Sequence, residues 1–338
     1  NRPGVARPPD YAELQCISNF SFLRGASHPG ELVAQAKALG HTAIGVADRN
    51  SLAGVVRAHA EAKREGFQLL VGARIDLMQE LDIGQPGLSC LVYPTDRTAY
   101  GRLCKLLSDG KRSAPKGECF IGLSDLCRRS EGQVLIALPP VDWNKHKDGF
   151  AALIQSLKKQ NPAGLWIAIH HLYRGDDRRR MAAISALAED LNVPLVATND
   201  VLYHTPERRE LQDVVACIRE GCLLSEAGFL LEAHGERHLK PGAEMARLFK
   251  AFSNAIRATH DIAALCTFTL DELRYNYPNE PVPPGKTAQQ HLTDLVESSL
   301  AERFGTAVPD KIRATVDKEL ALIDELKYPH YFLTVHDI

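Results

Sequence analysis

The chain has 338 residues, of which 45% are hydrophobic and 24% charged, a composition typical of folded globular proteins. Its 40 basic and 42 acidic side chains give a formal net charge of −2, so any contact with nucleic acid must come from local basic clusters. The eight cysteines include no Cys-x-x-Cys pair, which excludes a zinc-finger pattern and predicts reduced thiols in a cytoplasmic protein. No apolar run approaches the roughly 20 residues of a membrane span, and no signal peptide is recognisable.

The N-terminal segment predicts a leader followed by a buried strand. Residues 1–10 contain three prolines and are expected to form a flexible leader. Residues 14–18 are short, apolar-rich and followed by a Ser/Asn/Gly turn region, as in a strand that leads into a βα loop. Ser27 and Pro29 then supply a cap and a first turn for a helix over 31–39, which Gly40 ends.

Strand-like and helix-like segments alternate over the next 180 residues. Further strands are predicted at 42–47, 69–72, 88–93, 134–138, 165–169 and 194–198, and further helices at 52–65, 97–108, 150–159, 177–191 and 207–219. About seven β-then-α units favour a parallel sheet, and this number favours a closed barrel over an open doubly wound sheet. Functional side chains of such a barrel gather at the carboxyl ends of its strands.

The composition changes after Cys266. Residues 275–285 contain four prolines, which no helix or central strand accommodates, so 266–286 is predicted to be a linker. Beyond it, 289–304 and 309–326 show two amphipathic helical patterns, and 328–338 is an apolar run that ends abruptly. We therefore expect a barrel domain over 11–265 and a helical segment over 287–338 that continues in a longer protein.

Six stretches of the chain resemble the N-terminal part of the C-family bacterial DNA polymerases, and most of all their error-prone paralogue of the polymerase III alpha subunit. These stretches are LQCISNFSFLRGASHP, GVADRNSLAGVVRAHAEAKREG, LVGA, LVYPTDRTAYGRLCKLLSDGKRSAPKGE, VATNDVLYHTPERRELQDVVACI and ELKYPHYFLTVHDI. The resemblance implies a polymerase-and-histidinol-phosphatase (PHP) domain, an α/β fold with a distorted (β/α)7 barrel, over 11–265. It also implies that 287–338 begins a mainly α-helical polymerase core whose catalytic aspartates lie beyond Ile338.

For the full-length protein, the resemblance implies a DNA-directed DNA polymerase, a nucleotidyltransferase that uses Mg²⁺, DNA and deoxynucleoside triphosphates. Its roles would be DNA repair and replication, translesion synthesis and mutagenesis after DNA damage, with mutasome or sliding-clamp proteins as candidate partners and no membrane contact. No cofactor and no catalytic residue are expected in this chain itself.

The metal-binding pattern of active PHP domains can be carried over residue by residue, and nearly all of it is lost. An opening His-x-His falls on Gln15 and Ile17, and a closing Asp-x-His falls on Asp200 and Leu202. The ligand positions between them fall on Arg24, Arg49, Arg74, Ser89 and about Pro139. Among these nine positions, only Asp200 keeps its matched ligand type.

Such a residue set predicts that the phosphoesterase is inactive and that no metal binds. A metal cluster would generate hydroxide near neutral pH and polarise a phosphoryl oxygen, but it needs imidazole and carboxylate ligands. Ile17 and Leu202 cannot coordinate a cation. Each arginine would repel one by about 4 kcal/mol per unit charge at 4 Å and an effective dielectric of 20, and a divalent ion doubles that value.

The three arginines suggest two other arrangements. Together with Asp48 and Asp200 they are predicted to form an ion-paired plug in the barrel mouth, because buried charges must be paired. The alternative is a phosphate-binding pocket, since a cleft lined with arginine attracts a phosphate. His170, His171 and His204 complete no recognisable ligand set.

Lys105, Lys111, Arg112 and Lys116 surround a predicted loop at 108–117 that could contact DNA or a partner protein. Arg178–Arg180 are interpreted as a solvated helix face. Two rival functions remain at this stage: an active metal-dependent PHP phosphoesterase or 3′-5′ proofreading exonuclease, and a stand-alone regulatory binding module.

Overall fold

The computed structural model describes residues 10–78, 88–274 and 278–338. Residues 1–9 of the predicted leader and 275–277 of the predicted linker lie outside the described residues. The chain divides into two compact units, Asn1–Leu273 and Arg274–Ile338. None of the helices in the described ranges is long and apolar enough to cross a bilayer.

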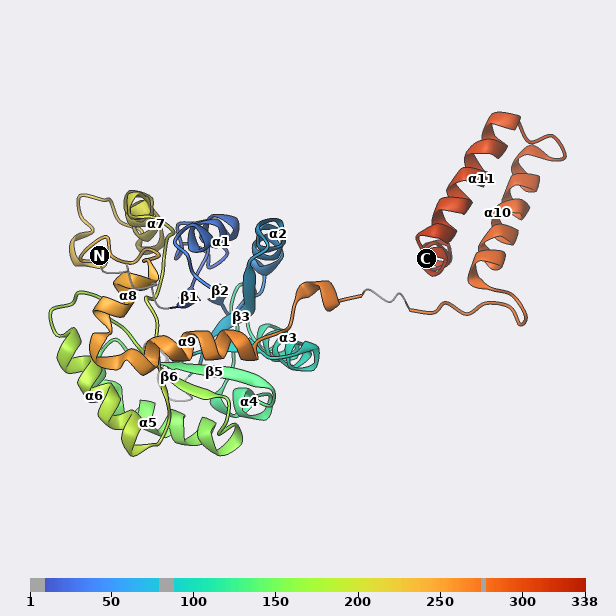
Figure 1. Ribbon diagram of the computed structural model, residues 1–338. Coiled ribbons are helices and arrows are strands. Elements are labelled where there is room, and N and C mark those ends of the chain that lie inside the picture. Colours follow the sequence, from blue (N-terminus) through green and yellow to red (C-terminus); the bar gives the residue numbers. More distant parts are fainter. Residues whose placement is uncertain (1–9, 79–87, 275–277) are drawn as a thin grey trace, which may run out of the picture. The chain divides into compact units, whose positions relative to one another are not determined.

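The first unit is built on one curled sheet of seven strands, which lie side by side in chain order (Figure 1). The strands are β1 (Ala12–Cys16), β2 (Ala43–Arg49), β3 (Gln68–Asp76), β4 (Ser89–Pro94), β5 (Gln133–Leu138), β6 (Leu165–Ile169) and β7 (Leu195–Ala197). The segment after β7 returns to β1, where Ile17 N–H donates to Val201 C=O (3.1 Å) and Val201 N–H donates to Gln15 C=O (2.8 Å). These contacts close the ring of strands and confirm the predicted α/β barrel.

One strand runs against the others, so the expectation of a wholly parallel sheet is wrong. β4 is antiparallel to both β3 and β5, whereas the remaining neighbours are parallel. An antiparallel neighbour needs no crossover helix between the two strands. The start of β4, Ser89, therefore lies at the same end of the barrel as the carboxyl ends of the other six strands. We call this end the mouth.

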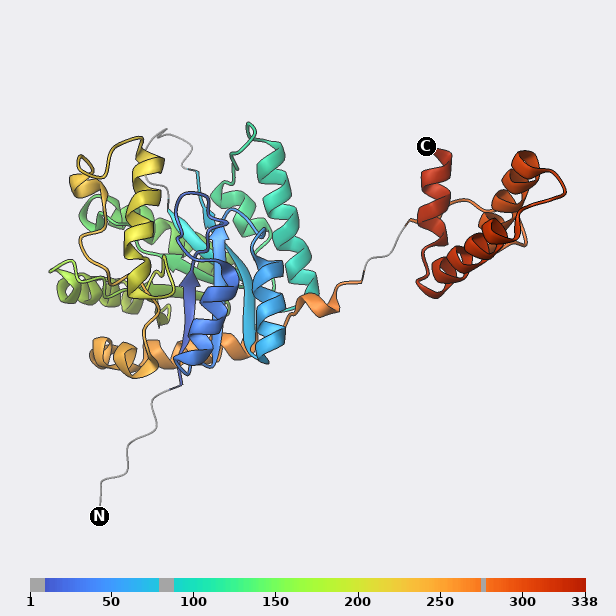
Figure 2. The ribbon, with the colours of Figure 1, turned by 90° about the horizontal axis from the view of Figure 1, so that it is seen from above.

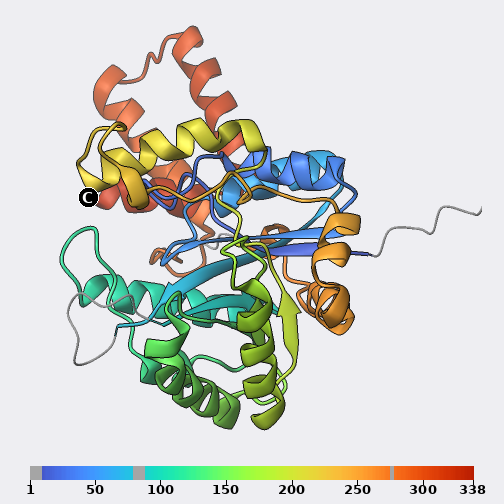
Figure 3. The same cartoon turned by 90° about the vertical axis from the view of Figure 1, so that its left-hand side faces the viewer.

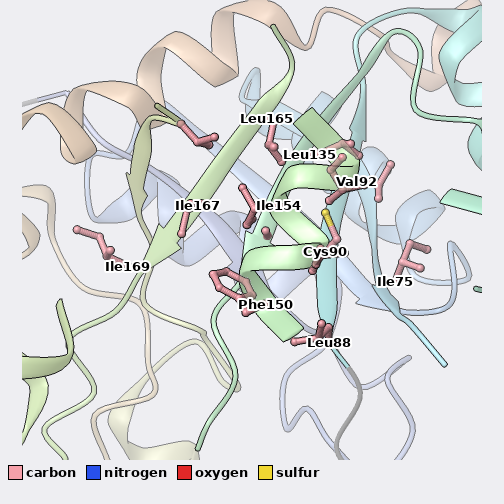
Figure 4. Packing of buried hydrophobic residues seen from close by; sticks show 14 of the residues in the cluster. Ile75, Leu88, Cys90, Val92, Leu135, Phe150, Ile154, Leu165, Ile167 and Ile169 are labelled. Carbon is pink, nitrogen blue, oxygen red and sulfur yellow. The ribbon is translucent and has the colours of Figure 1, made fainter. Parts of the chain in front are cut away.

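Helices surround the sheet of the first unit, and the last of them packs one face against the barrel interior. They are α1 (Pro29–Ala38), α2 (Val55–Glu65), α3 (Arg97–Arg112), α4 (Leu123–Arg128), α5 (Trp143–Gln160), α6 (Asp177–Asp190), α7 (Arg209–Glu220), α8 (Gly242–Leu248) and α9 (Ser253–Leu265). Figures 2 and 3 show α1 and α2 on one side of the strands and α5 and α6 on the other. Two separate apolar clusters hold them there, and Figure 4 shows the larger one, in which Phe150 and Ile154 of α5 pack onto β4, β5 and β6.

The barrel interior has its own apolar core, because side chains alternate between the two faces of each strand. Val134 and Ile136 of β5 point inward and pack with Ala258 and Ile262 of α9, whereas their neighbour Leu135 belongs to the outer cluster.

Tyr93 fills part of the interior. A Cβ atom on Gly45 or on Gly72 would lie 2.4 Å from the Tyr93 side chain, so both strands need glycine there. The tyrosine hydroxyl donates to the carbonyl of Leu14.

Several helix boundaries differ from the sequence prediction. α3 continues to Arg112 instead of ending near 108, because Gly110 is a packing position: a Cβ there would lie 2.6 Å from Ile121. α5 begins at Trp143, after Asp142, whose side chain caps it. α4, α8 and α9 were not predicted at all, and α4 and α8, with 6 and 7 residues, are too short for a clear periodic signal.

The start of the predicted linker packs on the barrel. Cys266 and Phe268 are buried, and the Phe268 ring stacks on Tyr100 at 4.4 Å between centroids. The second unit comprises α10 (Ala288–Phe304), α11 (Asp310–Glu325) and α12 (Pro329–Asp337).

Limited proteolysis tests the division into units. Residues 278–286 form no helix or strand, and Arg274 and Lys286 are exposed, so trypsin is expected to cut first at one of these two sites. Mass spectrometry of the early products should therefore show an intact barrel unit. Initial cleavage between residues 40 and 200 would contradict the boundary.

Candidate functional site

The barrel mouth gathers most of the positions that the sequence singled out. Gln15 is the next-to-last residue of β1, and Arg49 ends β2. Arg74 lies near the end of β3, next to Ser89 at the start of β4. Asp200 follows β7. Pro139 follows β5, where its carbonyl accepts a hydrogen bond from Arg180 (3.4 Å).

Asp76 is the first centre of charge pairing in the mouth. Its carboxylate accepts from Arg49 Nε (2.7 Å), Arg74 Nε (3.0 Å) and Ser89 Oγ (2.7 Å). Burial opposes ionisation of Asp76, but the charges of Arg74 and Arg49 outweigh it and hold its pKa below the usual range. Two guanidinium groups and one hydroxyl therefore share a single carboxylate.

Asp200 is the second centre. Its carboxylate pairs with Arg237 Nη2 (2.5 Å), whose side chain is only 6% exposed, and lies 4.0 Å from Arg74 Nη1. Arg237 in turn donates to Glu232 (2.9 Å). Burial is outweighed by the charges of Arg237 and Arg74, so the pKa of Asp200 lies well below its usual range. Arg74 thus links the two centres into one network, which we call the charge plug.

The composition of the charge plug differs from the sequence prediction in two ways. Asp48 makes no ion pair with the arginines among the described residues, because its carboxylate accepts from Ser18 Oγ (2.8 Å) and Ser21 Oγ (2.7 Å). Arg24 is exposed, and the structure records no ion pair of its side chain with a described residue. The predicted convergence of Arg24 and Asp48 on the plug is therefore wrong.

Gln15 replaces a histidine of the active pattern and is fully hydrogen-bonded. Its Oε1 atom lies 2.8 Å from both Thr198 Oγ1 and His170 Nε2, and the side chain also hydrogen-bonds Asp200. Because an amide oxygen only accepts, His170 donates through Nε2. Burial lowers the pKa of His170 to about 3, so the imidazole is neutral.

Ile17 and Leu202 replace the other two histidines. Both are buried in one small apolar cluster with Ala26 and Tyr203. The two lost ligand positions thus belong to the same apolar cluster.

These residues do not fit a metal cluster. Among the described residues, no group of three or more His, Cys, Asp or Glu side chains could hold an ion. The one carboxylate kept from the active pattern, Asp200, has its charge matched by Arg237 and Arg74. His171 lies beside Tyr173, and His204 Nδ1 is 2.7 Å from Ser27 Oγ, so neither joins Asp200.

The predicted basic loop is half helical. Lys105, Lys111 and Arg112 belong to α3 and only Lys116 follows it. All four side chains are exposed, and Lys105 pairs with Asp109 at 3.0 Å. The cluster is a solvated helix end rather than a loop shaped around a phosphate.

Sequence reasoning missed Asp76 and Arg237. Asp76 could have been found, because it lies two residues after Arg74 on one strand and therefore on the same face. Arg237 gives no such signal, since it lies in an irregular segment and reaches the mouth only through the tertiary fold.

The profile of the PHP domain family matches residues 13–185, just over half of the chain. The chain belongs to the PHP domain family. The profile of the bacterial DNA polymerase III alpha NTPase domain matches residues 290–338, within the second unit.

Curated relatives extend this result over the whole chain. An error-prone DNA polymerase from Rhodopseudomonas palustris is 51% identical over 98% of this chain, and one from Caulobacter vibrioides is 49% identical over 98%. The chain spans 29% and 30% of those two proteins. Among solved structures, an amidohydrolase from Chromobacterium violaceum matches 57% of this chain and 88% of its own, with 15% identity and a TM-score of 0.44.

The charge plug predicts the effect of Asp200→Asn. Asparagine keeps the side-chain volume and tolerates the left-handed backbone of Asp200 (φ 48°), but it leaves the buried Arg237 with Glu232 alone. The free energy of unfolding should fall by about 3 kcal/mol at pH 7, the lower end of the loss for a broken buried pair. Because the pKa of Asp200 is depressed in the folded state, the difference from wild type should shrink as the pH falls below about 4.

Urea denaturation followed by the fluorescence of Trp143 and Trp166, both in the barrel unit, measures this change. Glu131→Gln is a matched control, since it also removes a carboxylate from one arginine but at a site 82% exposed, where the loss should stay below about 1 kcal/mol. Equal losses in the two variants would contradict a buried charge plug.

Another carboxyl group, that of Glu13 in β1, is buried beneath the mouth. It accepts from Tyr11 Oη (2.7 Å) and from the backbone N–H groups of Gln15 (2.9 Å) and Asn199 (3.1 Å). The structure pairs it with no cation among the described residues, and burial raises its pKa from 4.5 to about 7.

Glu13→Gln should therefore stabilise the barrel at alkaline pH. A raised pKa means that the folded state binds the proton more tightly, so wild-type stability falls as the pH rises from about 4.5 to about 7. Glutamine stays neutral and should gain up to about 3 kcal/mol over wild type at pH 8, and little at pH 4.5. Urea denaturation at both pH values measures this difference, and a gain that does not grow with pH would contradict the buried, ionisable Glu13.

Proposed function

We propose that the chain is the N-terminal part of an error-prone DNA polymerase and that its PHP barrel serves as a scaffold without hydrolytic activity. The observation that carries the proposal is about 50% identity to error-prone DNA polymerases along 98% of the chain. The match of residues 290–338 to a polymerase III alpha domain supports the same assignment.

The scaffold role rests on the chemistry of the mouth. A hydrolytic site needs a bound metal or another source of activated water, together with an opening for a phosphodiester. In this mouth, arginines neutralise the carboxylates Asp76 and Asp200, and Ile17 and Leu202 occupy ligand positions with hydrocarbon. No observation favours a phosphoesterase or proofreading exonuclease over this role.

The full-length protein would use Mg²⁺ to extend a primer from deoxynucleoside triphosphates. In the proposal its catalytic carboxylates follow residue 338, and translesion synthesis, DNA repair and damage-induced mutagenesis in the cytoplasm are its cellular roles. Mutasome or sliding-clamp proteins are its proposed partners.

Primer extension tests the polymerase assignment. The full-length gene product is expected to extend a primed DNA template in the presence of Mg²⁺ and all four deoxynucleoside triphosphates, and the 338-residue chain is expected to add no nucleotide. A full-length product that binds primed DNA and adds no nucleotide would contradict the assignment.

Metal analysis and phosphodiester hydrolysis test the scaffold role separately. The purified 338-residue chain should retain no stoichiometric zinc, manganese or iron, and it should not cleave a phosphodiester when these ions are added. Two or more equivalents of bound metal, with hydrolysis that Asp200→Asn abolishes, would show an active site instead.

A further inference from the structure

The C-terminus of α7 brings two thiols together that the proposed function does not use. Gly221 directly follows α7, and its positive φ of 67° is the left-handed conformation that glycine favours. The N–H of Cys222 then donates to the carbonyl of Cys217 (3.1 Å), which is the long hydrogen bond of a Schellman motif. A contact between the side chains of these two residues frequently accompanies the motif. Cys217 and Cys222 accordingly line the same pocket, and their side chains are close enough to interact.

Both thiols line one open pocket of about 490 Å³. Its other walls are largely apolar side chains that are more than half exposed, including Ile218, Leu223 and Leu224. Cys217 is 6% exposed, and burial together with the Cys222 thiol raises its pKa. Cys222 is the more accessible of the two and is therefore the one that a small reagent reaches first.

The other cysteines have different surroundings. Cys16, Cys90 and Cys266 are buried in the barrel. Cys119 and Cys127 donate to the carbonyls of Leu107 and Ser156, each at 4.0 Å. Cys104 hydrogen-bonds Tyr100.

We propose that Cys217 and Cys222 are a peroxide-reactive dithiol that closes into an intrachain disulfide. The Cys222 thiolate attacks one oxygen of a peroxide, the O–O bond breaks, and Cys222 becomes a sulfenic acid while water or an alcohol leaves after protonation. The Cys217 sulfur then attacks the sulfenic sulfur, the S–OH bond breaks and a second water leaves. Overall, two thiols lose two electrons and two protons, and one peroxide is reduced.

The disulfide would fix the start of an exposed apolar segment. Residues 221–231 follow α7 and include Leu223, Leu224 and Phe229, and their far end is anchored by a hydrogen bond from Arg209 to the carbonyl of Glu232. Oxidation would tie Cys222, the second residue of this segment, to the last turn of α7. Chymotryptic cleavage after Leu223 or Leu224 should then become slower.

The test uses the reduced 338-residue chain treated with hydrogen peroxide, then denatured and alkylated. The mass of the wild-type chain should fall by about 2 Da on oxidation, and the alkylating reagent should modify two fewer of its eight cysteines. Peptide mapping should find a disulfide between Cys217 and Cys222 that a dithiol reductant reverses. Cys222→Ser and Cys217→Ser should each lose this link, and Cys119→Ser should keep it.

Peptide mapping of wild type decides the matter even if a variant folds poorly. Oxidation of the other six cysteines without a 217–222 link, or a Cys222 that proceeds to sulfinic acid with Cys217 still free, would overturn the proposal. Because primer extension is not a readout here, failure of this test leaves the polymerase assignment unaffected.

Discussion

The ion pair between Arg237 and Asp200 is the contact on which the barrel mouth depends. Arg237 Nε also donates to the backbone carbonyl of Asp200 (2.7 Å), and the Arg237 carbonyl accepts from Leu202 N–H (2.9 Å). Val201 lies between Asp200 and Leu202, and its backbone hydrogen bonds to Gln15 and Ile17 close the ring of strands. A buried guanidinium group must be paired, so the charge interaction and the closure of the barrel reinforce each other.

The carboxylates of the barrel mouth are neutralised by arginines rather than by metal ions. Three guanidinium groups, those of Arg49, Arg74 and Arg237, face three carboxylates, those of Asp76, Asp200 and Glu232. Arginine suits this role because its planar group donates to two partners at once and stays ionised. At two other ligand positions hydrocarbon fills the space, because Ile17 and Leu202 belong to one buried apolar cluster.

The sequence predicted the strands and most helices because their signals are local. Short apolar runs and flanking turn residues identified all seven strand regions, and Gly40 marked the end of α1. The direction of β4 was missed because strand periodicity carries no information about which way a neighbour runs. α9 was missed although it carries a helical signal: one face with Ala258 and Ile262 is buried, and the polar residues Arg257, His260 and Asp261 are exposed.

The site was predicted only in part because ion pairing depends on tertiary distances. Sequence similarity correctly predicted that Arg49, Arg74 and Asp200 lie at one end of the barrel. It could not show that the Asp48 carboxylate accepts hydrogen bonds from two serine hydroxyl groups instead of pairing with an arginine. Nor could it place Arg237, which lies 37 residues from Asp200 along the chain.

A double-mutant cycle between Asp200 and Arg237 tests the central claim most directly. The single variants Asp200→Asn and Arg237→Gln and the double variant together give the coupling free energy of the two side chains from urea denaturation at pH 7. A buried pair that holds the mouth together predicts a coupling of about 2 kcal/mol or more. A coupling near zero would show that the two charges act independently and would contradict the account of the mouth as a charge plug.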